Sequence, residues 1–115
     1  MKKSEVARDL SLSVLEEVLL YVLRGRERYG LEILTIVNEA HEGKRVITIG
    51  SLYPTLHRLE RKGFVRARWG QERPEERGGA RRRYYKITGL GERALREKEH
   101  MCASLTAWQP ALEKR

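Results

Sequence analysis

A helix with two unlike faces is predicted by residues 50–60, which read Gly50-Ser51-Leu52-Tyr53-Pro54-Thr55-Leu56-His57-Arg58-Leu59-Glu60. Leu52, Leu56 and Leu59 recur at intervals of four and three residues, so they lie on one side of an α-helix and face a core. The opposite side carries polar and small side chains, with flanking positions at its edges: Ser51, Pro54, His57, Arg58 and Arg61, flanked by Tyr53, Thr55 and Lys62. Such an outer face suits a helix that reads base edges in a DNA major groove, although an ordinary amphipathic surface helix has the same division.

The start of this helix is open between two N-cap residues. With Ser51 as the N-cap, Pro54 falls in the first turn, where a proline is well tolerated. With Thr48 as the N-cap, Pro54 lies one turn deeper.

Two helices and a short strand are predicted before this segment. Ser13 and Glu16 fit a capping box, and the apolar residues that follow keep a helical spacing until Gly25. A second helix opens at Tyr29-Gly30 and ends at Gly43, with an apolar stripe formed by Ile33, Ile36, Val37 and Ala40. Arg45-Val46-Ile47-Thr48 is a short segment that is mostly β-branched, which indicates a small strand.

A two-stranded hairpin and a last helix are predicted after it. Residues 65–69 and 83–87 alternate apolar and polar side chains, which is typical of half-buried strands. Residues 70–80 between them have no apolar pattern and predict a mobile loop. Thr88 is placed to cap the final helix.

This order of elements is that of a winged helix-turn-helix. The expected fold is therefore mainly α with a small β hairpin, plus a C-terminal dimerisation helix. We expect a flexible arm at residues 1–10, the winged helix-turn-helix at 11–88, and the dimerisation helix with its tail at 89–115.

The positive charge of the chain is concentrated in its middle. The 115 residues carry a net charge of +8, and residues 61–86 hold ten basic side chains against three acidic ones. A field of this sign attracts a polyanion through phosphate contacts and counterion release. Composition alone nominates a nucleic acid, an anionic membrane or an acidic protein, and a solvated charged loop has the same excess.

Three arginines at the hairpin tip favour DNA. Arg81, Arg82 and Arg83 follow the flexible pair Gly78-Gly79, and a guanidinium can grip phosphate oxygens in a bidentate way. Because side chains alternate along a strand, the three cannot all face one way. We expect Arg81 and Arg82 to contact DNA before Arg83.

Four segments together resemble the PadR-type transcriptional regulators. They are Tyr29-Gly30-Leu31-Glu32-Ile33, the stretch 50–60 quoted above, Gly63-Phe64-Val65, and Arg82-Arg83-Tyr84-Tyr85-Lys86-Ile87-Thr88 leading into Gly91. The resemblance spans residues 12 to 100 and implies a dimeric winged-helix regulator, most often a repressor, that binds an inverted-repeat operator. The contacts it implies are Ser51, Tyr53, Pro54, Thr55 and Arg58 in the helix and Arg81 and Arg82 in the wing, to which the outer face of the helix adds Arg61.

Two features of the resemblance leave the target open. The acidic segment 71–77 makes the wing long and leaves its path on DNA undetermined. A cyanobacterial relative represses a circadian clock gene, which makes a clock gene one candidate target, although no motif here establishes it.

The C-terminal helix predicts a homodimer. Met101, Leu105, Trp108 and Leu112 are spaced four, three and four residues apart, as on a coiled-coil seam. We expect this seam to pack against a second copy beside the first helix, with its residues Leu12, Leu15 and Leu19. The alternative is that the last helix folds back onto its own domain. A two-fold protein also matches two half-sites about one DNA turn, roughly 34–36 Å, apart.

Trp108 and Cys102 each allow a sensing role beside a plain structural one. Short relatives hold aromatic drugs between tryptophans at the dimer centre, which implies a small aromatic effector at Trp108; a core anchor is the simpler interpretation. Cys102 could be a redox switch, but a cysteine on an apolar stripe is more often a small buried hydrophobe.

Other classes of function are disfavoured. His41, His57 and His100 lack metal-ligand spacing, and the sequence has no Gly-rich phosphate loop, so we expect no enzyme, no metal and no cofactor. The longest apolar run, Val18 to Leu23, is too short to span a membrane, and a single cysteine without a signal peptide indicates the cytoplasm. Double-stranded promoter DNA is the leading partner; a basic face that docks on an acidic protein is the alternative, and structured RNA is a third.

Overall fold

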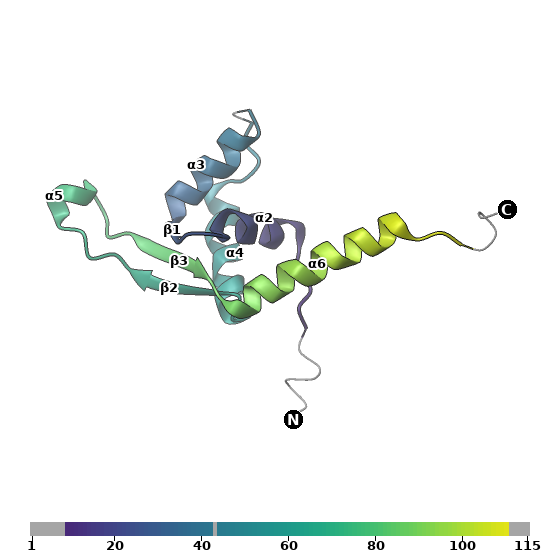
Figure 1. Ribbon diagram of the computed structural model, residues 1–115. Coiled ribbons are helices and arrows are strands. Elements are labelled where there is room, and N and C mark those ends of the chain that lie inside the picture. Colours follow the sequence, from purple (N-terminus) through teal and green to yellow (C-terminus); the bar gives the residue numbers. More distant parts are fainter. Residues whose placement is uncertain (1–8, 43, 111–115) are drawn as a thin grey trace, which may run out of the picture.

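The computed structural model describes residues 9–42 and 44–110, and Figure 1 shows how their elements are arranged. A group of helices stands at the centre, the hairpin extends from it on one side, and the C-terminal helix extends on the other. In chain order the elements are α2 (Val14–Leu23), β1 (Arg28–Tyr29), α3 (Gly30–Ala40), α4 (Ile49–Arg61), β2 (Val65–Trp69), α5 (Pro74–Arg77), β3 (Arg83–Ile87) and α6 (Gly89–Ala107). This arrangement confirms the predicted winged helix-turn-helix with an additional C-terminal helix.

The helix boundaries follow from capping residues. Glu16 N–H donates to Ser13 Oγ at 3.2 Å and Ser13 N–H donates to Glu16 Oε1 at 2.8 Å, which confirms the predicted capping box of α2. Gly25, just beyond the helix, has a φ of 108°, a conformation that favours glycine. Thr48 is the N-cap of α4, so Pro54 lies in the second turn and removes one helical hydrogen bond there.

The three strands form one antiparallel sheet in the order β1-β3-β2. β2 and β3 make the wing, with Val65 opposite Ile87 and Trp69 opposite Arg83. β1 lies at the other edge of β3, where Arg28 is opposite Tyr85. The sequence did not predict β1, because two residues are too few to carry an alternating pattern.

The small strand predicted at residues 45–48 is wrong. The side chain of Asn38, on α3, takes the backbone groups that a strand partner would otherwise bind. Its Oδ1 accepts the N–H groups of Val46 and Ile47 at 2.8 and 3.1 Å, and its Nδ2 donates to Ile47 O at 3.2 Å. The segment is therefore held to α3 without joining the sheet.

The core lies where α2, α3 and α4 meet the sheet and the first turns of α6. The three leucines predicted to face inward from α4, Leu52, Leu56 and Leu59, are fully buried in it. An ion pair adds to this packing: Glu16, 2% exposed, binds Lys62 Nζ at 2.8 Å and so ties the start of α2 to the end of α4. With one face in the core, α4 presents its other face at the surface.

The segment predicted as a loop, residues 70–80, contains the helical turn α5. Arg73 Nε donates to Glu76 Oε1 at 2.8 Å, and Tyr84 on β3 donates to Glu72 Oε2 at 2.9 Å. Gly78, with a φ of 66°, ends the turn. The acidic side chains of the wing thus bind partners within the wing itself, an order that polar residues can hold without any apolar pattern.

The C-terminal half of α6 extends away from its own domain (Figure 1). Gly91 N–H donates to Thr88 Oγ1 at 3.1 Å, which confirms the predicted cap. Met101, Leu105 and Trp108 are 49%, 70% and 68% exposed, and Leu112 lies outside the described residues. This half of the helix does not fold back onto the domain as the alternative prediction required.

Two predictions about apolar surface are wrong. Leu19 cannot be a dimer contact, because the core of its own chain already buries it completely; Leu12 and Leu15 are half-buried. Cys102 is exposed rather than buried. The predicted arm at 1–10 lies mostly outside the described residues, and among the helices described none has the length and apolarity of a membrane span.

Candidate nucleic-acid interface

The outer face of α4 is accessible along most of its length. Pro54, His57 and Arg61 are exposed, and Tyr53 is 40% exposed at its edge. In the described part of the chain Arg61 has no carboxylate partner, and it stands in the last turn of the helix. This face therefore presents the guanidinium of Arg61, the ring of His57 and the side chain of Pro54 to anything that approaches it.

Two residues predicted on this face are committed to the helix itself. Ser51, half-buried, donates from Oγ to Thr48 O at 3.1 Å and accepts from Thr48 N–H at 3.2 Å, which makes it part of the N-terminal cap. Thr55 is only 1% exposed, and its hydroxyl donates to Ser51 O at 2.7 Å. The prediction of Thr55 as a DNA contact is wrong, because its side chain is buried and its hydroxyl binds the backbone of its own helix.

Thr55 instead positions Arg58, which is one turn further along α4. Arg58 Nη2 donates to Thr55 Oγ1 at 3.1 Å, so one end of the guanidinium is fixed against the helix. Arg58 is half-buried. The remaining donors of its planar fork keep a defined direction, which suits contact with a base edge or a phosphate.

The wing arginines lie on aromatic rings. The guanidinium of Arg82 is 4.4 Å from the centroid of the Tyr29 ring, and that of Arg81 is 5.4 Å from the centroid of Trp69. Arg83 also lies over Trp69, at 5.0 Å, and donates to Glu60 of α4 at 3.3 Å. Arg83 is thus turned toward α4 and partly neutralised, whereas neither Arg81 nor Arg82 forms an ion pair with a carboxylate among the described residues. The ranking of these arginines as DNA contacts stays a prediction.

A second set of stacked side chains stiffens the base of the wing. Tyr29 and Tyr84 meet edge to face at 5.7 Å, and Arg68 lies 4.6 Å over Tyr84. Arg68 also forms an ion pair with Glu27, and its hydrogen bonds hold the pKa of that carboxyl below its usual range. Sequence reasoning missed these supporting residues; the signal that could have found them is the interleaving of arginine with aromatic residues in both strands.

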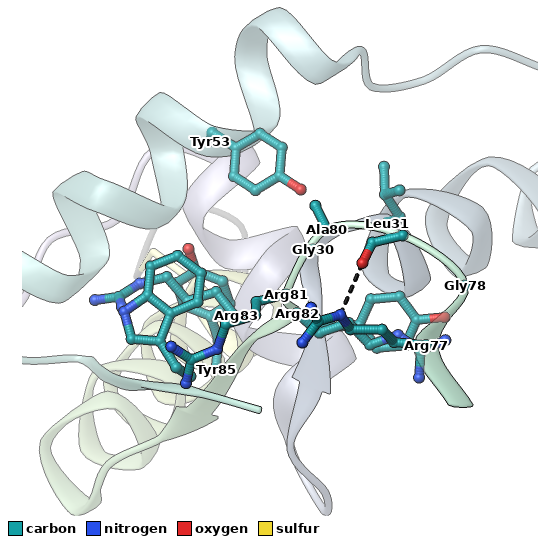
Figure 2. A pocket seen from close by; sticks show the side chains of 13 residues that line it. Gly30, Leu31, Tyr53, Arg77, Gly78, Ala80, Arg81, Arg82, Arg83 and Tyr85 are labelled. Carbon is teal, nitrogen blue, oxygen red and sulfur yellow. Dashed lines mark hydrogen bonds between the residues drawn. The ribbon is translucent and has the colours of Figure 1, made fainter. Parts of the chain in front are cut away.

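Two grooves lie between the wing and the helices, and Tyr53 lines both of them. One, of 590 Å³, lies between the wing tip and the start of α3, and the other, of 720 Å³, lies between α4 and β3. Tyr53, Arg83 and Tyr85 line both. Figure 2 shows Tyr53 on one side of the first groove and Arg77 and Arg82 across from it. The outer face of α4 and the wing arginines therefore border one continuous surface.

Within residues 9–42 and 44–110 no three histidine, cysteine or carboxylate side chains gather in a way that could hold a metal ion. His57 is exposed on the outer face of α4, His41 is exposed just after the end of α3, and His100 is exposed on α6. The chemistry on offer at this surface is recognition by cations, hydroxyls and flat rings. These are the groups that contact phosphates, sugars and base edges in protein–DNA interfaces.

A helix with a free outer face, placed beside a basic β hairpin, defines the winged-helix class of nucleic-acid-binding proteins. Comparison with known families agrees and is more specific. The chain belongs to the transcriptional regulator PadR-like family, whose model matches residues 19–97. The members of this family are transcription regulators that bind DNA, not enzymes.

Individual relatives agree with this assignment. An uncharacterised protein of Lysinibacillus sphaericus is 30% identical over 92 residues, which are 80% of this chain and 81% of that protein. The structure of a PadR-like transcription factor from Bacteroides fragilis is 30% identical with a TM-score of 0.69, covering 80% of this chain and 82% of the other. Bacillus subtilis PadR, solved in complex with operator DNA, is 23% identical with a TM-score of 0.66 over 87% of this chain and 51% of its own, a likeness of fold.

Proposed function

We propose that this chain is a homodimeric repressor that binds an inverted-repeat operator through α4 and the wing. The observation that carries the proposal is the continuous surface on which exposed Pro54, His57 and Arg61 of α4 meet Arg81 and Arg82 of the wing. The apolar inner face of α4 packs in the core, so the outer face has a fixed orientation relative to the rest of the domain. Bacillus subtilis PadR, which has the same fold, was solved in complex with operator DNA, and this supports DNA as the partner.

Each group has a role in this proposal. Arg58 reads a base edge or grips a phosphate, with Thr55 as its positioning residue rather than a contact. The other helix contacts are Tyr53, Pro54 and Arg61, and Ser51 contributes the hydrogen-bonding capacity that its capping bonds do not use. At the wing tip, Arg81 and Arg82 bind backbone phosphates. Phosphate contacts fix the register, and base contacts supply the specificity.

The second copy is proposed to cover the C-terminal half of α6. Met101 and Leu105 expose apolar surface there, as does Trp108 just beyond the end of the helix, and Leu12 and Met101 line the same groove of 430 Å³. A helix that extends from its domain with one apolar stripe needs a partner to remove that stripe from water. Two-fold symmetry then places two α4 helices on two half-sites.

Three further expectations stay predictions: the cytoplasm as location, a clock gene as target and an aromatic effector at Trp108.

The proposal is tested by measuring binding of the whole chain to the promoter of its own operon and to a scrambled duplex of equal length. We expect a clear preference for the promoter and a log–log salt slope of about −0.9 for each phosphate neutralised. Arg58→Ala should cost about 1–3 kcal/mol on the promoter alone if the contact is a base edge. Arg82→Ala should weaken both duplexes alike.

Arg93→Ala is the matched control, because Arg93 is an exposed arginine of α6 away from this surface. It removes the same charge and should leave both affinities within the effect of net charge. Equal affinity of the wild-type chain for promoter and scrambled duplex would contradict the proposal. A partner protein that is captured equally well in the presence of excess promoter DNA would favour the acidic-partner alternative.

A further inference from the structure

The groove between the wing tip and the start of α3 has more features than a DNA-contacting surface requires. Its volume of 590 Å³ lies within the range of about 300–1,000 Å³ typical of small-molecule sites. Residues from α3, α4 and both sides of the wing line it, so it exists only because the hairpin folds beside the helices. Figure 2 gives a close view of the groove with the arginines of the wing along it.

One part of the lining is apolar and uncovered. Leu31 is 50% exposed, Tyr53 is 40% exposed and Trp69 is 50% exposed, and all three line this groove. Gly30 lets the Tyr53 ring lie close against the start of α3, because a Cβ there would lie 2.5 Å from the tyrosine hydroxyl oxygen. Flat and branched apolar surfaces left open in one concave place favour a ligand with a flat ring.

The other part of the lining is cationic. Arg77, Arg81, Arg82 and Arg83 line the groove, and among residues 9–42 and 44–110 no carboxylate lines it. Arg83 is paired with Glu60, whereas Arg77 donates to Gly79 O at 2.7 Å and Arg81 to Gly70 O at 3.3 Å. Bonds to main-chain oxygens orient a guanidinium without cancelling its charge. The groove is therefore complementary to an anion.

We propose that this groove binds a small organic anion that carries a flat ring, with the ring against Tyr53 and Leu31 and the anionic group on Arg77 and Arg81. Arg81 and Arg83 already lie on Trp69, so the indole contributes its free edge. Bidentate donation from arginine suits a carboxylate, a sulfonate or a phosphate monoester. The groove lies on the side of the molecule proposed to face DNA. It is therefore a different place from Trp108, where the sequence suggested an aromatic effector.

The binding has a consequence that rests on the proposed function. Arg81 is also a proposed phosphate contact, and the same guanidinium cannot hold the ligand and the DNA backbone at once. Occupancy of the groove therefore lowers operator affinity by competition at the wing. In this scheme the anion acts as an inducer that needs no movement of the dimer.

The test uses the full-length chain and follows the indole N–H signals of its two tryptophans by NMR. The Trp69 signal is identified as the one that Trp69→Phe removes. Three probes are titrated: naphthalene-2-sulfonate, its neutral analogue naphthalene-2-sulfonamide, and inorganic sulfate. We expect a saturable shift of the Trp69 signal with the sulfonate, and binding about tenfold weaker for the other two, because one loses the charge and the other the ring.

Two double variants separate the groove from general charge. Arg77→Gln with Arg81→Gln should weaken sulfonate binding about tenfold, whereas Arg93→Gln with Arg96→Gln on α6 removes the same charge and should leave it unchanged. Equal shifts from sulfonate and sulfonamide, equal loss in both double variants, or a shift at Trp108 alone would overturn the site. Because this titration contains no DNA, it stands apart from operator binding: a bound sulfonate that leaves operator affinity unchanged overturns only the competition.

Discussion

Replacing Thr55 by valine removes one buried hydroxyl and leaves the volume of the side chain nearly unchanged. That hydroxyl is 1% exposed, donates to Ser51 O at 2.7 Å and accepts from Arg58 Nη2 at 3.1 Å. The variant therefore frees Arg58 from α4 without adding or removing a group at the DNA-facing surface. It tests whether buried Thr55 sets the direction of Arg58 on the proposed DNA-binding surface.

Two magnitudes follow from these contacts. A hydrogen bond to a charged group contributes about 1.5–3 kcal/mol where water is excluded. Because Arg58 is only half-buried, we expect about 1 kcal/mol of lost operator affinity, which is a factor of about five. The free energy of unfolding should fall by a similar amount, about 1 kcal/mol, since the bond to Ser51 O is lost as well.

Fluorescence anisotropy with a labelled promoter duplex measures the affinity, and urea denaturation measures the stability. Thr55→Ser keeps the hydroxyl and is the matched control: its affinity should stay near that of the wild-type chain. Unchanged promoter affinity in Thr55→Val, or an equal loss in Thr55→Ser, would refute the positioning role of this hydroxyl.

The remaining predictions concern assembly and stability. Leu105→Glu places a charge on the α6 seam, so light scattering should give a monomer and promoter affinity should fall; a dimer of unchanged mass would remove this seam from the interface. Burial acts to raise the pKa of Glu16, but the hydrogen bond from Lys62 and those at Ser13 outweigh it and hold the pKa below its ordinary value of 4.5. The stability that this shift contributes is present above pH 4.5 and is lost as the pH falls through the lower pKa of the folded state. The free energy of unfolding of Glu16→Gln at pH 7 should therefore be about 1.5 kcal/mol lower than that of the wild-type chain, and it should fall less steeply as the pH is lowered. Equal steepness of the two stability curves at acid pH would contradict this. A Cβ at Gly91 would lie 2.3 Å from Phe64 O, and Gly91→Ala should cost about 1–3 kcal/mol of thermal stability, a loss that an unchanged melting temperature would rule out.

The parts of the fold that rest on periodicity and capping could be predicted from the sequence. Leu52, Leu56 and Leu59 repeat at helical spacing, and they are fully buried. Ser13 and Thr88 are capping residues as expected, because a cap depends on neighbours a few positions away. The hairpin also follows from local alternation, and its register is that of an ordinary antiparallel pair.

What could not be predicted depends on contacts between distant segments. Asn38 binds the backbone of residues 46 and 47, so a stretch with β-branched residues remains outside the sheet. Thr55 occupies an edge position on the helical wheel, and only the packing of α4 decides that it is buried. Leu19 belongs to the same apolar stripe as Leu15, yet one is fully buried in its own chain and the other is half-buried. A stripe gives the direction of a side chain but not which surface covers it.

The placement of α4 and the wing on DNA is tested most directly by cleavage of the promoter from tethered iron chelates. Cys102→Ser removes the single cysteine, and a chelate is then attached through His57→Cys on α4, through Gly79→Cys at the wing tip, where a Cβ meets nothing within 4 Å, or through Arg93→Cys on α6. We predict two cleavage clusters from position 57 about one helical turn, roughly 34–36 Å, apart, and clusters from position 79 outside them. Cleavage spread evenly along the duplex, or equally strong from position 93, would contradict recognition by α4 and the wing.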